Sequence, residues 1–173
     1  MTIEKAAERW KKVCSSEFPV LCYDIGESYY KGEGGKQNYR KAAELFTLAC
    51  HGRISLACYY LGTLYADGKG VKQNYYKAAE LWEKNCDRAT IYDLGYLYYY
   101  GKGVIQNSQK AAELWKKVCD GGSIIRACIN LGTLYEVGEG VRQDYAMAKE
   151  YYGKACDLGN QRGCDGYKRL NNR

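Results

Sequence analysis

The sequence repeats itself, and this limits the possible folds more than any other feature. Lys-Ala-Ala-Glu begins at residues 5, 41, 77 and 110, and a degenerate Met-Ala-Lys-Glu begins at residue 147. A second marker is a glycine in a constant setting, at Gly26, Gly62, Gly95 and Gly132. The steps between these glycines are 36, 33 and 37 residues, so the period is about 36. A repeat of this length buries its apolar face only by stacking on its neighbours.

Each repeat predicts two helices. In "YRKAAELFTLAC" the apolar residues recur at i, i+3, i+4 and i+7, and "LACYYLGTLYADG" has the same pattern. A Gly-x-Gly follows the second of these segments. Because it returns in every repeat, we interpret it as a helix C-cap and not as a phosphate-binding loop. The residues expected to cap the next helix are Asn38, Asn74, Asn107 and Asp144.

The repeated glycine inside a helix predicts a close helix–helix contact. Glycine costs about 1 kcal/mol there relative to alanine, so its return at one position indicates a neighbour that leaves no room for a Cβ. Pro19 is the one proline in the chain, which favours helix throughout. The predicted fold is all-α, a single right-handed α-solenoid over residues 1–173. Its parts are an opening helix at about 2–14, repeats at about 19–50, 55–86, 89–119 and 124–157, and a closing helix at about 162–170.

The segment "LGTLYADGKGV", residues 61–71, resembles the Sel-one-like repeat, a relative of the tetratricopeptide repeat. The Lys-Ala-Ala-Glu helix after it does so as well, and the resemblance covers nearly the whole chain. The paired cysteines resemble one subfamily, the Helicobacter cysteine-rich proteins. This resemblance implies a secreted protein, and it also implies penicillin binding and weak β-lactamase activity.

The cysteines follow the repeats at spacings of eight or nine residues. A zinc site needs four converging ligands, usually in Cys-x-x-Cys pairs or with histidines, and a redox motif needs the same short spacing. The chain has no Cys-x-x-Cys, so we expect no metal, and disulfides that join the end of one helix to the start of the next. Each would stabilise the fold by about 2–3 kcal/mol. The expected pairs are Cys14–Cys22, Cys50–Cys58, Cys119–Cys128 and Cys156–Cys164.

Cys86 has no partner in this scheme. Three residues are missing between Cys86 and Gly95, and Ile91 occupies the partner position. We expect a free thiol in a monomer, and a Cys86-linked dimer is the alternative. Disulfides indicate an oxidising compartment, so the expected location is secreted or periplasmic, with a signal peptide already removed.

Other function classes find little support in the composition. The net charge is +6, but basic residues stand near acidic ones, which predicts a solvated surface and no nucleic-acid partner. No apolar run approaches the roughly 18 residues of a membrane span. No cofactor is expected.

A catalytic site is hard to find in the sequence. His51 is the one histidine and is expected in a seven-residue connection between helices. Ser28-Tyr29-Tyr30-Lys31 matches the first element of the serine β-lactamases, but the companion elements are absent and Ser28 aligns with packing leucines. We therefore assign no catalytic residue.

Within the repeat bounds given above, the first helix of each repeat is the one that carries the repeated glycine. Its outward positions are the candidates for ligand binding. They are rich in tyrosine, which gives a large contact area at low entropic cost. The predicted function is a scaffold that binds a peptide, a protein or a cell-wall (peptidoglycan) fragment in a concave groove; the alternative is a weak β-lactamase. The predicted groove residues are Tyr23, Asp24, Glu27, Tyr59, Thr63, Tyr92, Asp93, Tyr96 and Asn130.

Overall fold

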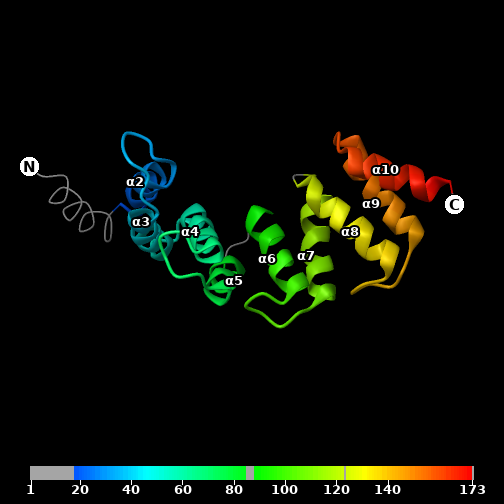
Figure 1. Ribbon diagram of the computed structural model, residues 1–173, viewed down its shortest axis with the longest axis horizontal. Coiled ribbons are helices and arrows are strands. Elements are labelled where there is room, and N and C mark those ends of the chain that lie inside the picture. The colour runs from blue at the N-terminus through cyan, green and yellow to red at the C-terminus, as the bar shows by residue number, and fades with distance from the viewer. Residues whose placement is uncertain (1–17, 85–87, 123, 173) are drawn as a thin grey trace, which may run out of the picture. The chain divides into compact units, whose positions relative to one another are not determined.

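The computed structural model describes residues 18–84, 88–122 and 124–172, and helix is the regular structure of these segments (Figure 1). The predicted opening helix, Cys14 and Cys86 lie outside the described residues. The helices are α2 (Pro19–Lys31), α3 (Tyr39–His51), α4 (Ser55–Asp67), α5 (Tyr75–Glu83), α6 (Arg88–Tyr100), α7 (Ser108–Asp120), α8 (Ile125–Val137), α9 (Tyr145–Asp157) and α10 (Gln161–Asn171).

The chain divides into two compact units. The first unit, Met1–Asn85, contains α2 to α5, and the second unit, Cys86–Arg173, contains α6 to α10. Within each unit every helix packs against the next one along the chain. This sequential packing confirms the predicted all-α class. The prediction of one domain over residues 1–173 remains a prediction.

The ends of the helices follow the predicted capping pattern. The side chains of Asn38, Asn74 and Asn107 each accept a hydrogen bond from the backbone N–H three residues later. Asp144 accepts from two backbone N–H groups at the start of α9. At the other end of the first helices, Gly68 has φ of 70°, the left-handed geometry that only glycine reaches without steric cost, and its counterparts in α2 and α8 do the same.

A glutamine clamp closes each hairpin, which the sequence interpretation missed. In each connection between paired helices, a glutamine side-chain N–H donates to the backbone carbonyl seven residues earlier, at 2.7 to 2.9 Å. That carbonyl belongs to the last turn of the first helix, where no intrahelical partner is left. The donors are Gln37, Gln73, Gln106 and Gln143.

The core is built from a glycine and an aromatic ring in each hairpin. A Cβ on Gly62 would lie 2.2 Å from Nε1 of Trp82, and a Cβ on Gly95 would lie 2.5 Å from Nε1 of Trp115. The helices thus approach as closely as predicted, and the ring is what leaves no room for a side chain. Around these rings the alanines of the repeated segment are fully buried, which gives a thin core with few large aliphatic residues.

Within the described segments, three of the predicted disulfides are present; two join one repeat to the next, and the third joins the last repeat to α10. Cys50–Cys58 links α3 to α4, Cys119–Cys128 links α7 to α8, and Cys156–Cys164 links α9 to α10. Their Cα–Cα distances are 4.5 to 5.0 Å. Cys22, whose predicted partner Cys14 is not described, is buried in α2.

The predicted seven-residue connection around His51 is wrong. Helix α3 continues through Cys50 and ends at His51, and α4 begins at Ser55, so only three residues connect the two helices. Arg53 in this connection has φ of 64°, which is uncommon for a residue with a side chain. The bridge can therefore form directly between the last turn of α3 and the first turn of α4.

Candidate functional site

In the first unit, the predicted groove residues of α2 are held by one another. The Tyr23 hydroxyl donates to Oε1 of Glu27 at 3.1 Å, and Lys31 Nζ lies 3.0 Å from the same oxygen. Burial, and then the nearby Glu27 carboxylate, raise the pKa of Tyr23 above its ordinary value. Asp24 is exposed beside them. The predicted groove residues of α2 thus present a neutral tyrosine, a paired carboxylate and a solvated carboxylate.

Tyr60 of α4 joins the tyrosines of α2 into one aromatic cluster. Its ring centroid lies 5.1 Å from that of Tyr30 and 6.2 Å from that of Tyr23. The same ring stacks on Phe46 of α3 at 5.3 Å. Residues of two successive repeats therefore share this surface, which we call the first-unit aromatic cluster.

Tyr59 and Thr63 lie at the edge of this cluster. The Tyr59 ring meets Tyr60 edge-on at 5.4 Å. The Thr63 hydroxyl donates to the backbone carbonyl of Tyr59 at 3.1 Å, and the Trp82 indole N–H donates to the same carbonyl at 3.3 Å. The Thr63 hydroxyl is thus engaged by its own helix, whereas the Tyr59 ring remains half-exposed.

In the second unit, the structure brings two predicted groove residues from different helices together. The Tyr92 side chain of α6 hydrogen bonds to Asn130 of α8. Burial raises the pKa of Tyr92, and the Asn130 hydrogen bond opposes this increase in part. The indole N–H of Trp115 donates to the Tyr92 carbonyl at 3.1 Å, which repeats the arrangement at Tyr59.

Tyr96 is the most accessible tyrosine among the predicted groove residues. It is 39% exposed, and its ring lies 4.4 Å from that of Tyr100, which is 53% exposed. The Lys102 ammonium lies over both rings, at 5.2 and 5.7 Å from their centroids. Asp93 is half-buried on the same helix. This end of α6 therefore offers exposed aromatic area with a cation beside it.

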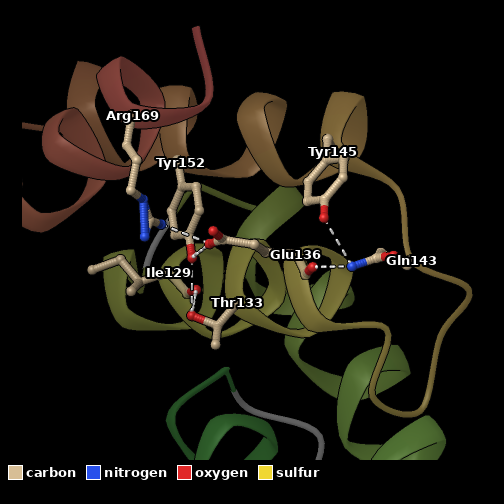
Figure 2. A network of polar contacts seen from close by, with 7 residues as sticks. All are labelled: Ile129, Thr133, Glu136, Gln143, Tyr145, Tyr152 and Arg169. Atoms are coloured by element: carbon tan, nitrogen blue, oxygen red, sulfur yellow. Dashed lines mark hydrogen bonds and ion pairs between the residues drawn. The ribbon is translucent and has the colours of Figure 1, made fainter. Parts of the chain in front are cut away.

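A polar network replaces the tryptophan at the last hairpin (Figure 2). The Tyr152 hydroxyl donates to Oε2 of Glu136 at 2.9 Å, and Arg169 of α10 donates to the same oxygen at 2.7 Å. The Tyr152 hydroxyl also lies 3.2 Å from Oγ1 of Thr133. Burial is the main reason that the pKa of Tyr152 is raised. The sequence feature that could have indicated this network is the tyrosine at residue 152, where the two preceding hairpins have Trp82 and Trp115.

Two cavities lie away from the predicted groove residues. One, of about 680 Å³, lies among the end of α3, α4 and α5. The other, of about 750 Å³, lies among α7, the end of α8 and the loop before α9. The predicted groove residues therefore form open surfaces and do not line either of these cavities.

The β-lactamase-like motif has other partners. The Ser28 hydroxyl donates to the Asp24 backbone carbonyl at 3.1 Å, and Lys31 pairs with Glu27. Among the described residues, no cluster of three histidine, cysteine or acidic side chains is arranged to hold a metal ion. In the same residues, no helix combines the length and the apolar character that crossing a membrane requires.

Within each unit, hairpins packed in sequence order and tied by disulfides define a helical repeat scaffold. The Sel1 repeat model matches residues 19–52, 55–88, 89–123 and 125–160, so the chain belongs to the Sel1 repeat family. Each match contains one hairpin of the structure. Cys50–Cys58 and Cys119–Cys128 join consecutive matches, and Cys156–Cys164 joins the last match to α10.

Solved structures support this assignment. A protective antigen of uropathogenic Escherichia coli, c5321, with an SLR fold matches at TM-score 0.82 and 27% identity over 91% of this chain; this chain spans 34% of that protein. A Sel1 repeat protein of Oxalobacter formigenes matches at 0.79 and 24% identity, over 93% of this chain and 70% of that one. Helicobacter pylori cysteine-rich protein B matches at 0.53 and 28% identity, over 73% and 96%. No curated protein matches the chain. These likenesses confirm the α-solenoid class.

Proposed function

We propose that this chain is an extracytoplasmic binding scaffold that holds an extended peptide, or a peptide-bearing protein or cell-wall fragment, on the outward face of its first helices. The three disulfides of the described residues support an oxidising location. The Sel1 repeat family and the likeness to the structure of a cysteine-rich protein support a scaffold role.

One observation carries the proposal: tyrosines of successive repeats stand on the first helices with polar partners beside them. In the second unit Tyr92 and Asn130 come from different repeats, so a ligand that contacts both must run across the helices. Hairpins in a helical stack lie about 10 Å apart. An extended chain covers that distance in about three residues, so the side chains of one repeat can engage one short segment of ligand.

The test uses a displayed library of random peptides selected on the oxidised full chain, with muropeptides as a separate arm. Affinities of the selected ligands are then measured by calorimetry for Tyr59→Ala, Tyr92→Ala and the control Tyr76→Ala. Tyr76 is 67% exposed on α5, a second helix. Loss of an aromatic anchor of about 2 kcal/mol lowers affinity about thirtyfold. We expect Tyr59→Ala to lower the affinity of ligands that bind at α4 by this factor, and Tyr92→Ala that of ligands that bind at α6. Tyr76→Ala should leave both affinities unchanged.

Helical circular dichroism of each variant must match that of the parent. If folded Tyr59→Ala and Tyr92→Ala both keep the parental affinity, the ligand binds elsewhere and the proposal fails. If Tyr76→Ala loses affinity and the other two do not, the second helices form the binding surface.

The hydrolase alternative that the resemblance implies gains no support from the geometry of Ser28. We expect turnover of the chromogenic β-lactam nitrocefin to be slow and equal in the parent and in Ser28→Ala. Brisk turnover by the parent that disappears in a folded Ser28→Ala variant would reverse this conclusion.

A further inference from the structure

The cavity of the first unit opens a disulfide to solvent. Cys50 and Cys58 both contribute to the lining of this space of about 680 Å³, and both are half-buried. By contrast, Cys119 and Cys128 are only 3% and 1% exposed. A small reagent therefore has direct access to the first bridge, whereas the packing of α7 against α8 must open before it reaches the second.

Basic side chains line the same cavity as the accessible bridge. Arg53, Lys77 and Lys84 line the same cavity, opposed by Glu80. Lys84 Nζ lies 2.8 Å from Oε1 of Glu80, so these two charges largely neutralise each other and Arg53 and Lys77 are in excess. Positive charge next to a disulfide attracts an anionic thiol and stabilises the thiolate that leaves, and both effects speed thiol–disulfide exchange.

The third bridge has charges of both signs along the chain. Lys154 and Arg162 each precede one of its cysteines by two residues, and Lys154 pairs with Asp120 and Glu150. Asp157 directly follows Cys156, and Asp165 directly follows Cys164. A carboxylate next to a cysteine repels both an incoming thiolate and a departing one. Cys50 is instead followed by His51, and Cys58 by Tyr59. Burial protects Cys119–Cys128, and the sequence around Cys156–Cys164 carries no excess of positive charge.

We propose that Cys50–Cys58 is an exchangeable disulfide with a binding pocket for small anionic thiols, whereas the other two described bridges are permanent ties. The thiolate of the small molecule attacks one cysteine sulfur and forms a mixed disulfide. The Cys50–Cys58 bond breaks, its electron pair leaves on the other cysteine, and that thiolate takes a proton from water. A second small thiolate then attacks the small-molecule sulfur of the mixed disulfide, releasing an oxidised dimer and a second cysteine thiol.

Exchange at this position has a local structural consequence. It removes the covalent tie between α3 of the first Sel1 repeat and α4 of the second, and it leaves α7 to α10 tied as before. The first hairpin is then held to α4 by the three-residue backbone connection and by packing, without a crosslink. A small thiol in the surrounding solution would thus selectively loosen the junction between α3 and α4.

The first experiment compares two thiols of opposite charge on the oxidised full chain. Glutathione, with two carboxylates, and cysteamine, with an ammonium group, are supplied at equal thiolate concentration. Acid quenching, alkylation and peptide mass mapping give the rate at each bridge. We expect Cys50 and Cys58 to react at least tenfold faster than Cys119 and Cys128 and several-fold faster than Cys156 and Cys164, with glutathione faster than cysteamine. Equal rates at all three bridges, or the highest rate at Cys119–Cys128, would overturn the proposal.

The second experiment removes the excess positive charge. The Arg53→Gly/Lys77→Gln variant keeps the left-handed turn at residue 53, because glycine accepts that φ. We expect its preference for glutathione over cysteamine to fall at least threefold. The control, Lys102→Gln/Arg142→Gln, removes two charges of the second unit and should leave the preference unchanged. A preference that survives in the first variant would show that the pocket charges do not select the thiol.

Discussion

The two units build the same hairpins but use their tyrosines differently. In the first unit, Tyr23, Tyr30 and Tyr60 pack ring against ring around Phe46. In the second unit tyrosine side chains bond to polar side chains of the next repeat, as at Tyr92 with Asn130 and Tyr99 with Glu139, whereas the Tyr23 hydroxyl bonds to Glu27 of its own helix. The repeat therefore specifies the backbone, and the outward residues set the chemistry of each surface separately.

The largest effect is expected where a helix approaches an aromatic ring most closely. Gly62→Ala would place a Cβ 2.2 Å from the buried Trp82 ring and should destabilise the first unit by about 3 kcal/mol. Gly26→Ala is the matched control, because its nearest neighbour is the Phe46 ring at 3.0 Å and alanine gains about 1 kcal/mol in helix propensity. Urea unfolding followed by circular dichroism measures both. Equal losses in the two variants would mean that the ring contact does not govern the cost.

Removing a disulfide from either unit tests whether the bridges contribute equally. Cys50→Ala/Cys58→Ala and Cys119→Ala/Cys128→Ala open loops of nearly the same length, with separations of eight and nine residues. Each pair of substitutions should therefore lower the free energy of unfolding by about 2–3 kcal/mol. A loss in the second unit that is twice that in the first would indicate that burial of the sulfur atoms matters more than loop closure.

A smaller effect should separate the polar network from its counterpart in the first unit. The Glu136 side chain is 15% exposed and accepts two hydrogen bonds, whereas Glu27 is 26% exposed. Glu136→Gln weakens bonds to a hydroxyl and a guanidinium and should lower stability by about 1–2 kcal/mol. Glu27→Gln should cost less than about 1 kcal/mol, because water screens its ion pair more fully. Thermal unfolding at low and high salt measures both. The reverse order would contradict the contrast drawn between the two surfaces.

The smallest expected effect is an increase in the free energy of unfolding. Arg53 has φ of 64°, and the connection at the matching seam of the second unit has Gly122 with φ of 69°. Arg53→Gly relieves a left-handed strain of about 1–2 kcal/mol and adds some entropy to the unfolded chain, so we expect a net gain of about 0.5–1 kcal/mol. Gly122→Ala should lose a similar amount, and urea midpoints measure the pair. A loss of stability in Arg53→Gly would mean that the arginine side chain makes contacts worth more than the strain.

The sequence predicted what depends on local spacing. Caps such as Asn74, the close contact at Gly62 and the bridges between helices separated by a few residues all follow from residue types that return at short, fixed spacings. The Gln73 clamp also returns in every repeat, but its partner is a backbone carbonyl, which leaves no residue type to recognise.

Contacts between repeats were harder to predict. The bond from Arg169 to Glu136 joins residues 33 apart and depends on how α10 packs, which no periodicity reveals. The predicted groove residues present a different difficulty. Their position on the first helices follows from the repeat, but whether a ligand uses them depends on chemistry outside the chain.

The disulfides between successive helices affect what proteolytic cleavage does to the molecule. Arg53 is an exposed basic residue in a connection of three residues, the kind of segment that a trypsin-like protease cuts. A cut there would not release a fragment, because Cys50 and Cys58 lie on opposite sides of the nick and hold the two pieces together. On a non-reducing electrophoresis gel the cleaved molecule would migrate as an intact chain, and it would separate into two fragments only after reduction. Its repeats would stay in register after the backbone had been cut.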